Sequence, residues 1–145
     1  MKITLVVEGR LRSGRAQEWI ETYRKRLEGQ MPLSILQWGS PHKQKEIKFF
    51  ASLKPDETTA ALDENGRSFK STEFAAHLGG LRSVYRHLYL FLGEAEGHSD
   101  TVIQNVRGKW SLSPMTMSYE VTLVMVCEQL YRALTILTGH PYHKE

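Results

Sequence analysis

The 145-residue chain is long enough for one domain with its own core. Its composition, with 41% hydrophobic and 24% charged residues, excludes a disordered protein. A single cysteine excludes an internal disulfide, which suits a reducing cytoplasm, and the short apolar N-terminus is not a secretory signal. The net charge of +3 is uneven: residues 1–54 carry 11 Lys and Arg against 5 Asp and Glu, whereas residues 55–145 carry 8 against 11. The basic first part favours contact with an anionic polymer such as nucleic acid; the alternative is a set of solvated helix faces.

The first elements in chain order are a strand over residues 1–7 and an amphipathic helix over residues 14–28. The helix has an apolar face whose members recur at steps of three and four: Ala16, Trp19, Ile20, Tyr23 and Leu27. Ser13 is its expected N-cap. Basic residues off that face are expected to meet solvent or RNA: Arg15, Arg24, Lys25 and Arg26. A second strand is predicted over residues 33–38, then a short basic helix within residues 41–54, before Pro55.

The next elements are a third strand over residues 58–63, ended by a turn at residues 64–66, and a helix over residues 72–78. Ser71 is the expected cap of that helix, and Gly79 and Gly80 are expected to stop it. Residues 88–92 form an uninterrupted apolar run, which predicts a strand buried on both faces of a parallel sheet.

The last part of the chain is predicted to hold a helix carrying Val102, Ile103 and Val106, an extended piece at residues 110–112, and a helix over residues 119–137 that ends at Gly139. Strands that alternate with helices predict an α/β fold with a mainly parallel sheet flanked by helices. We expect residues 1–145 to form a single domain.

The final helix is apolar nearly all round, so more than one of its sides must be covered. In so small a domain a second subunit is expected to cover one side, and the sequence therefore predicts a homodimer. Glu128, Gln129 and Arg132 near its middle argue against a membrane span. Glu128 and Arg132 are interpreted as an ion pair four residues apart. Cys127 inside this helix is expected to be inert.

Three loops follow the carboxyl ends of predicted strands, where ligands bind in open α/β sheets: residues 8–15, 63–67 and 93–97. None carries a dinucleotide-binding or phosphate-loop pattern, which argues against a nucleotide triphosphatase. The loop at residues 93–97 is interpreted either as a ligand loop or as a plain tight turn. His140 and His143 have only Glu145 nearby to complete a metal site, so no metal is expected.

Three segments carry a more specific signal: residues 110–116 (Trp-Ser-Leu-Ser-Pro-Met-Thr), residues 128–133 (Glu-Gln-Leu-Tyr-Arg-Ala) and the tail at residues 140–144 (His-Pro-Tyr-His-Lys). Residues 1–7, Leu62-Asp63 with Gly66, and Leu92-Gly93 with Gly97 accompany them in order. Together they resemble the RlmH family, the pseudouridine N3-methyltransferases of large-subunit ribosomal RNA in the knotted SPOUT superfamily. The resemblance spans nearly the whole chain and is weakest over residues 38–57.

The resemblance implies a homodimer with a C-terminal trefoil knot, in which the last helix is threaded through a loop of the preceding chain. It implies a cytoplasmic enzyme that uses S-adenosylmethionine to methylate N3 of a pseudouridine in 23S ribosomal RNA, on assembled ribosomes, with no metal and no membrane partner. It also implies which residues bind the cofactor: Leu62, Gly93, Leu112, Ser113, Pro114, Met115, Thr116 and Met117.

The tail is the expected catalytic segment. N3 of pseudouridine carries a proton that must leave, and His143 is the candidate base because histidine titrates near neutrality. Tyr142 and Lys144 are expected to orient the base and to hold phosphate; Lys144 stands where the family usually has arginine, so it keeps the charge without the bidentate geometry. The alternative is that the tail is a simple C-terminal anchor.

Three positions depart from the family pattern: Glu94 replaces a usual glycine, Tyr119 a histidine and Leu123 an arginine. They favour an alternative function, a non-catalytic RNA- or ribosome-binding paralogue that keeps the knotted fold. A third hypothesis, a flavodoxin-like phosphoryl or flavin protein, would need a phosphate loop after the first strand. Residues 8–14 have the charge for such a loop but not the pattern.

Overall fold

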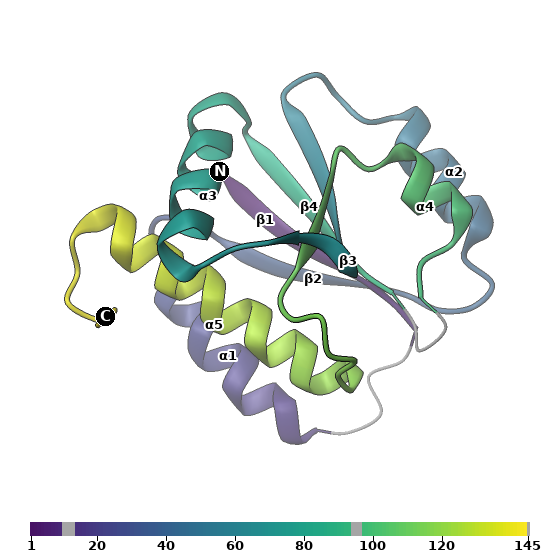
Figure 1. Ribbon diagram of the computed structural model, residues 1–145. Helices are drawn as coiled ribbons and strands as arrows, with labels where there is room; N and C mark the ends of the chain where they lie inside the picture. The colour runs from purple at the N-terminus through teal and green to yellow at the C-terminus, as the bar shows by residue number, and fades with distance from the viewer. Residues whose placement is uncertain (10–13, 94–96, 145) are drawn as a thin grey trace.

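A computed structural model describes residues 1–9, 14–93 and 97–144, and strands and helices alternate along them as expected (Figure 1). The elements in order are β1 (Lys2–Glu8), α1 (Arg15–Leu27), β2 (Leu33–Trp38), α2 (Lys43–Ala51), β3 (Glu57–Ser68), α3 (Ser71–Val84), β4 (His87–Leu92), α4 (Asp100–Asn105), β5 (Gly108–Ser111) and α5 (Tyr119–Thr138). The predicted α/β class is confirmed.

The sheet has the strand order β2-β1-β4-β3-β5, and every neighbouring pair is parallel. The inner strands β1 and β4 are nearly fully buried, as their apolar runs predict. Leu5 and Val6 are neighbours on β1 and belong to two different hydrophobic clusters, because successive side chains of a strand point to opposite faces. The sheet therefore has a core on each face.

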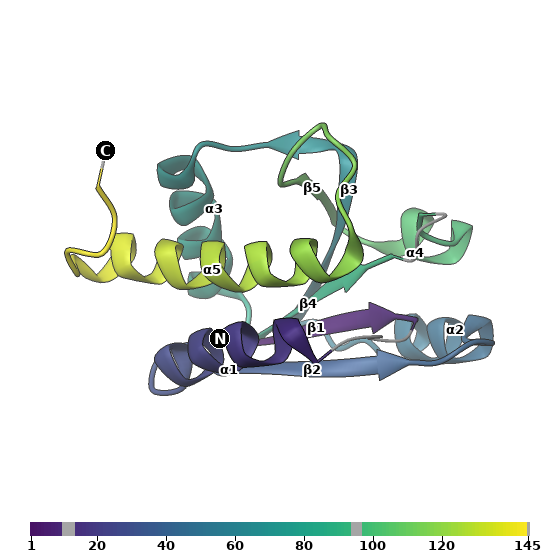
Figure 2. The same cartoon turned by 90° about the horizontal axis from the view of Figure 1, so that it is seen from below.

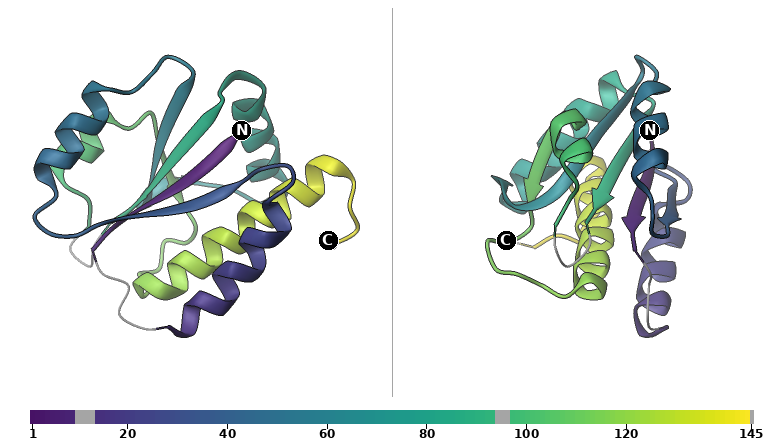
Figure 3. Two further views of the ribbon diagram at one scale, coloured as in Figure 1. Left: turned by 180° about the vertical axis from the view of Figure 1, so that it is seen from behind. Right: turned by 90° about the vertical axis from the view of Figure 1, so that its right-hand side faces the viewer.

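Helices α1, α3 and α5 cover the larger core, and α2 and α4 cover the smaller one (Figures 2 and 3). The smaller core is mostly aromatic: Phe49 of α2 packs edge-on against Trp38 and Phe91, with ring centroids 5.8 and 5.5 Å apart. Helix α5 is long and apolar enough to cross a membrane by length and composition, but it packs against α1 and α3 and buries Leu123, Leu130 and Leu134. It is the central helix of the larger core.

The predicted turn at residues 64–66 is wrong, because these residues belong to β3. The strand runs to Ser68 with a register shift between Leu62 and Arg67, and its second part continues to pair with β5. A Cβ atom on Gly66 would lie 2.6 Å from the carbonyl carbon of Lys109 and 2.7 Å from the amide nitrogen of Trp110. Gly66 therefore allows β5 to approach the bulged strand closely instead of ending it.

The prediction that Gly79 and Gly80 stop α3 is also wrong, because the helix continues through both glycines to Val84. A Cβ atom on Gly79 would lie 2.8 Å from a terminal methyl of Leu137 on α5, so the missing side chain allows the two helices to pack closely. The α3–α5 contact, which local sequence does not show, outweighs the low helix propensity of glycine. The N-cap of α3 is Lys70 and not Ser71.

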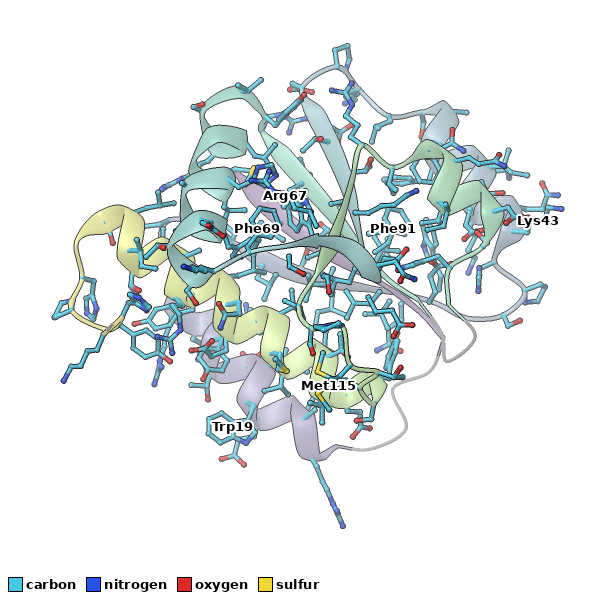
Figure 4. The ribbon with its side chains drawn as sticks, in the orientation of Figure 1. Trp19, Lys43, Arg67, Phe69, Phe91 and Met115 are labelled. Carbon is cyan, nitrogen blue, oxygen red and sulfur yellow. The ribbon has the colours of Figure 1, made fainter. Side chains whose placement is uncertain are left out.

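Two expectations for α1 also need correction. Trp19, assigned to the buried face, is 59% exposed, although it stacks on Tyr23; the other four members of that face are buried. Gly14 is at the N-cap, and the expected cap, Ser13, lies outside the described residues. Trp19 is visible at the outer surface of α1 in Figure 4.

The close approach at Gly66 leads to a stability prediction. We expect Gly66→Ala to lower the free energy of unfolding by about 2 kcal/mol, because backbone atoms of β5 cannot move aside as a flexible side chain can. Gly80→Ala is the matched control: nothing lies within 4 Å of its Cβ position, so alanine should stabilise α3 by about 0.5–1 kcal/mol. Urea unfolding of the two variants measures both effects, and equal stabilities would contradict the packing at Gly66.

Candidate functional site

A pocket of about 580 Å³ opens at the bulge of β3, at the carboxyl end of β4 and beside the segment that follows β5. Three segments far apart in the sequence form its walls: residues 62–65, residues 92–93 with 97–98, and residues 112–119 except Pro114. Ligands of parallel α/β sheets bind at this edge, where successive strand ends face one crevice.

The pocket brings together nearly all the residues predicted to bind a cofactor. Of that set, the residues that line it are Leu62, Gly93, Leu112, Ser113, Met115, Thr116 and Met117. Pro114 does not line it. The bulge of β3 and the segments that follow β4 and β5 thus contribute to one cavity. In the sequence, only the family resemblance grouped these residues.

The segment between β5 and α5 is fixed at the pocket by two hydrogen bonds. The amide of Met115 donates to Ser113 Oγ at 3.0 Å, and Thr116 Oγ1 donates to Glu64 Oε2 at 3.0 Å. The second bond ties this segment to the bulge of β3. Met115 is 75% exposed, and Figure 4 shows it near the N-terminal end of α5. The two bonds therefore hold the loop at the pocket while Pro114, Met115 and Thr116 stay exposed.

The opposite wall is built around Gly93. A Cβ atom there would lie 3.0 Å from both the carbonyl carbon of Gly97 and Nδ1 of His98. His98, which sequence reasoning did not anticipate, is bound through Nε2 to the carbonyl oxygen of Leu62 at 2.6 Å. The neighbouring Glu94, a departure from the family pattern, lies outside the described residues. The wall has no room for a side chain at Gly93.

Polar and apolar surfaces share the pocket. Leu62, Leu92 and Ile103 provide apolar walls, and Asp63 and Glu64 provide two carboxylates. Such a lining suits a ligand that combines an apolar ring with a cationic centre, and it would repel phosphate. Tyr119 and Thr122 at the start of α5 also line the pocket; their position just after the predicted loop was the one signal that could have found them.

The tail packs on the other end of α5. Tyr142 donates to Glu128 Oε1 at 3.1 Å and its ring lies edge-on to Tyr131, with centroids 4.7 Å apart. Burial, with further contributions from Tyr23 and Glu128, raises the pKa of Tyr142 to about 12. The Glu128–Arg132 ion pair is confirmed, with Arg132 Nε 3.0 Å from Glu128 Oε1. Lys144 is exposed.

His143 is held by Arg132, whose Nη1 lies 3.1 Å from Nδ1 of the imidazole. A guanidinium group has no acceptor, so Nδ1 accepts this hydrogen bond and a neutral imidazole carries its proton on Nε2. In this arrangement Nε2 can donate a hydrogen bond but cannot take a proton. His143 can therefore act as a base only after its hydrogen bond with Arg132 breaks.

Figure 1 shows the tail beyond the last turn of α5, and Figure 4 shows Met115, which lines the pocket, before its first turn. Tyr119 at the first turn lines the pocket, and Tyr142 and His143 contact Glu128 and Arg132. Glu128 and Arg132 lie about 14 and 20 Å from Tyr119 along the helix. Among the described residues, none of the tail lines the pocket of its own chain.

A family model described as a predicted SPOUT methyltransferase matches residues 1–143. The chain belongs to this SPOUT family. The flavodoxin-like hypothesis is therefore set aside.

Similar proteins named ribosomal RNA large subunit methyltransferase H support the same assignment. The protein of Hahella chejuensis is 31% identical over all of both chains. That of Xylella fastidiosa (strain 9a5c) is 34% identical over 99% of this chain and 98% of its own. That of Synechococcus sp. (strain RCC307) is 38% identical over 99% of this chain and 95% of its own. The resemblance to the RlmH family is thereby confirmed.

Three residues singled out in the sequence can now be placed within the SPOUT domain. Tyr119 lines the pocket, so this departure bears on ligand fit. Leu123 is fully buried in the larger core and lies at neither the pocket nor the exposed surface. Cys127 is fully buried, and burial raises the pKa of its thiol to about 12, so it is not a nucleophile at neutral pH.

Proposed function

We propose that this SPOUT protein is a cytoplasmic S-adenosylmethionine-dependent methyltransferase that modifies N3 of a pseudouridine in 23S ribosomal RNA, on assembled ribosomes. The pocket carries the proposal, because it gathers residues 62, 93, 112–113 and 115–117 at the ligand-binding edge of a SPOUT sheet. The names of the full-length relatives supply the substrate class. We take residues 1–145 as one domain that carries the whole activity.

The lining of the pocket fits S-adenosylmethionine. Leu62, Leu112 and Ile103 offer apolar surface for an adenine ring, and the main chain of residues 112–117 offers groups for its polar edge. The carboxylates of Asp63 and Glu64 attract the positive sulfonium centre. When bound, the cofactor supplies an electrophilic methyl group. The chain's residues then serve to position the two reactants, which lowers the barrier by prior alignment.

A second copy of the chain completes the site in this proposal. On α5 and the adjacent α1, exposed apolar side chains need a cover: Val121 is 50% and Trp19 59% exposed. An antiparallel two-fold pairing along α5 would cover them and would bring the tail of each subunit to the pocket of its partner. The separation of tail and pocket within one chain supports this arrangement. We also propose, from family membership, that α5 is threaded through the preceding chain as a trefoil knot.

His143 is the proposed base in the composite site. Substrate binding would have to draw it from Arg132, freeing a ring nitrogen for the N3 proton. Tyr142 would orient the imidazole, and Lys144 would hold an RNA phosphate. Arg26 of α1 lies close by, with its guanidinium carbon 5.3 Å from the centre of the Tyr131 ring, so the RNA would meet positive charge beside the tail.

Calorimetric titration of the purified protein with S-adenosylmethionine tests the function. We expect saturable binding with one site per chain in a folded dimer. No binding to such a dimer would overturn the enzyme proposal. It would favour the non-catalytic RNA-binding paralogue instead, for which Tyr119 in the pocket is the supporting observation.

A further inference from the structure

Behind the Gly93 wall lies a buried group of two carboxyl and two imidazole side chains from three segments. Glu8 ends β1, His42 and Glu46 lie at the start of α2, and His98 precedes α4. Their side chains are 2%, 16%, 0% and 4% exposed, in that order. Buried charged groups of this kind need a partner of opposite charge. The methyl-transfer site proposed above uses neither Glu8, His42 nor Glu46.

The polar atoms of this group converge. Nδ1 of His42 lies 3.2 Å from Glu8 Oε2 and 3.6 Å from Glu46 Oε2. One ligand atom from each of Glu8, His42 and Glu46 lies within 4.8 Å of the other two. In a tetrahedral zinc site with bonds of about 2.0–2.1 Å, ligand atoms lie roughly 3.3 Å apart. The observed separations are close to those of a metal site.

His98 supports the site from outside this group of three. Its Nε2 lies 2.6 Å from the Leu62 carbonyl oxygen, which can only accept, so Nε2 carries a proton. Its Nδ1 faces Glu8 Oε1 at 3.5 Å, and the other oxygen of that carboxyl group is the one near His42. A neighbour that orients a ligating carboxylate in this way is typical of metal sites.

Glu46 is likewise oriented by a neighbour. Ser99 Oγ lies 2.9 and 2.8 Å from its two carboxyl oxygens. Two buried carboxyl groups this close together need a positive charge between them, which a divalent cation would supply.

We propose that Glu8, His42 and Glu46 bind a divalent transition-metal ion, with Zn²⁺ the preferred occupant. One imidazole nitrogen and two carboxylate oxygens, with water in the fourth position, form a ligand set that suits zinc, and zinc exceeds manganese and iron in affinity for such sites. His42, at 16% exposure, offers the entry path. The ion would fasten β1 and α2 together, and His98 and Ser99 before α4 would hold its two carboxylate ligands.

The experiment strips the full-length protein with a chelator and titrates it with ZnCl₂, with metal content measured by mass spectrometry. We expect one Zn²⁺ per chain. Glu46→Gln, which keeps the size and the Ser99 contact, should lower the affinity about a hundredfold. His140→Ala is the matched control, because it removes the other histidine-rich candidate, the exposed tail, and should leave the affinity unchanged.

Affinity that Glu46→Gln leaves intact, or that His140→Ala removes, would overturn the proposal. Co²⁺ in the wild-type protein provides a readout that needs no variant. The intense visible absorption of tetrahedral Co²⁺ is expected, and its absence would show that no tetrahedral metal site forms there. This result is decisive even if Glu46→Gln fails to fold.

Discussion

The Gly93→Val substitution is expected to lower the affinity for S-adenosylmethionine by about ten- to a hundredfold. Even the first carbon of a side chain would lie 3.0 Å from Gly97 and His98, and the two methyl groups of valine would extend further into the wall or the cavity. Overpacking of this size costs about 1–3 kcal/mol where the neighbours cannot move away, and each 1.4 kcal/mol is a tenfold change in affinity.

Calorimetric titration of Gly93→Val beside the wild-type protein measures this loss. Gly29→Val is the matched control: it makes the same replacement at an exposed glycine with nothing within 4 Å of the Cβ position. It should bind the cofactor as the wild-type protein does. Unchanged affinity in Gly93→Val, with folding verified by circular dichroism, would place the cofactor elsewhere.

A mixture of two inactive variants is expected to regain activity if the tail of each subunit serves its partner's pocket. Gly93→Val damages the pocket and keeps the tail. His143→Ala keeps the pocket and should lower methyl transfer about 10²- to 10⁴-fold, the usual contribution of a general base. In a mixed dimer, the intact pocket of the His143→Ala subunit meets the intact tail of the Gly93→Val subunit. One complete site forms, so purified mixed dimers should show about half of the wild-type rate.

The reciprocal pairing provides the control. A wild-type subunit combined with a Gly93→Val/His143→Ala subunit has its intact pocket opposite a defective tail, so these dimers should be nearly inactive. If each tail served its own pocket, the two results would be exchanged: the first mixture would be inactive and the second half-active. Methyl transfer by dimers purified with two different affinity tags measures both.

Local patterns predicted most of the fold. The apolar run at residues 88–92 and the three- and four-residue spacing of α1 are signals that do not depend on distant contacts. The errors at Gly66 and Gly79 have the opposite cause. Each glycine lies where another element approaches closely, β5 in one case and α5 in the other, so tertiary contact and not local propensity determines the backbone there.

The candidate site could likewise be predicted only in part from the sequence. Residues 112–117 and the tail were identified by family resemblance, because no physical rule links an apolar loop to a cofactor. The separation of His143 from the pocket at Tyr119 required the structure. The Glu8–His42–Glu46 group could not be predicted, because its members are spread over residues 8–46 and meet only in the folded chain.

Methyl transfer from labelled S-adenosylmethionine to large ribosomal subunits tests the central claim most directly, with the modified nucleotide identified by mass spectrometry. The proposed function predicts about one methyl group per 23S ribosomal RNA, on N3 of a pseudouridine, with assembled ribosomes as the substrate. No transfer to those ribosomes by a folded dimer that binds the cofactor, or transfer to another kind of nucleotide, would contradict it.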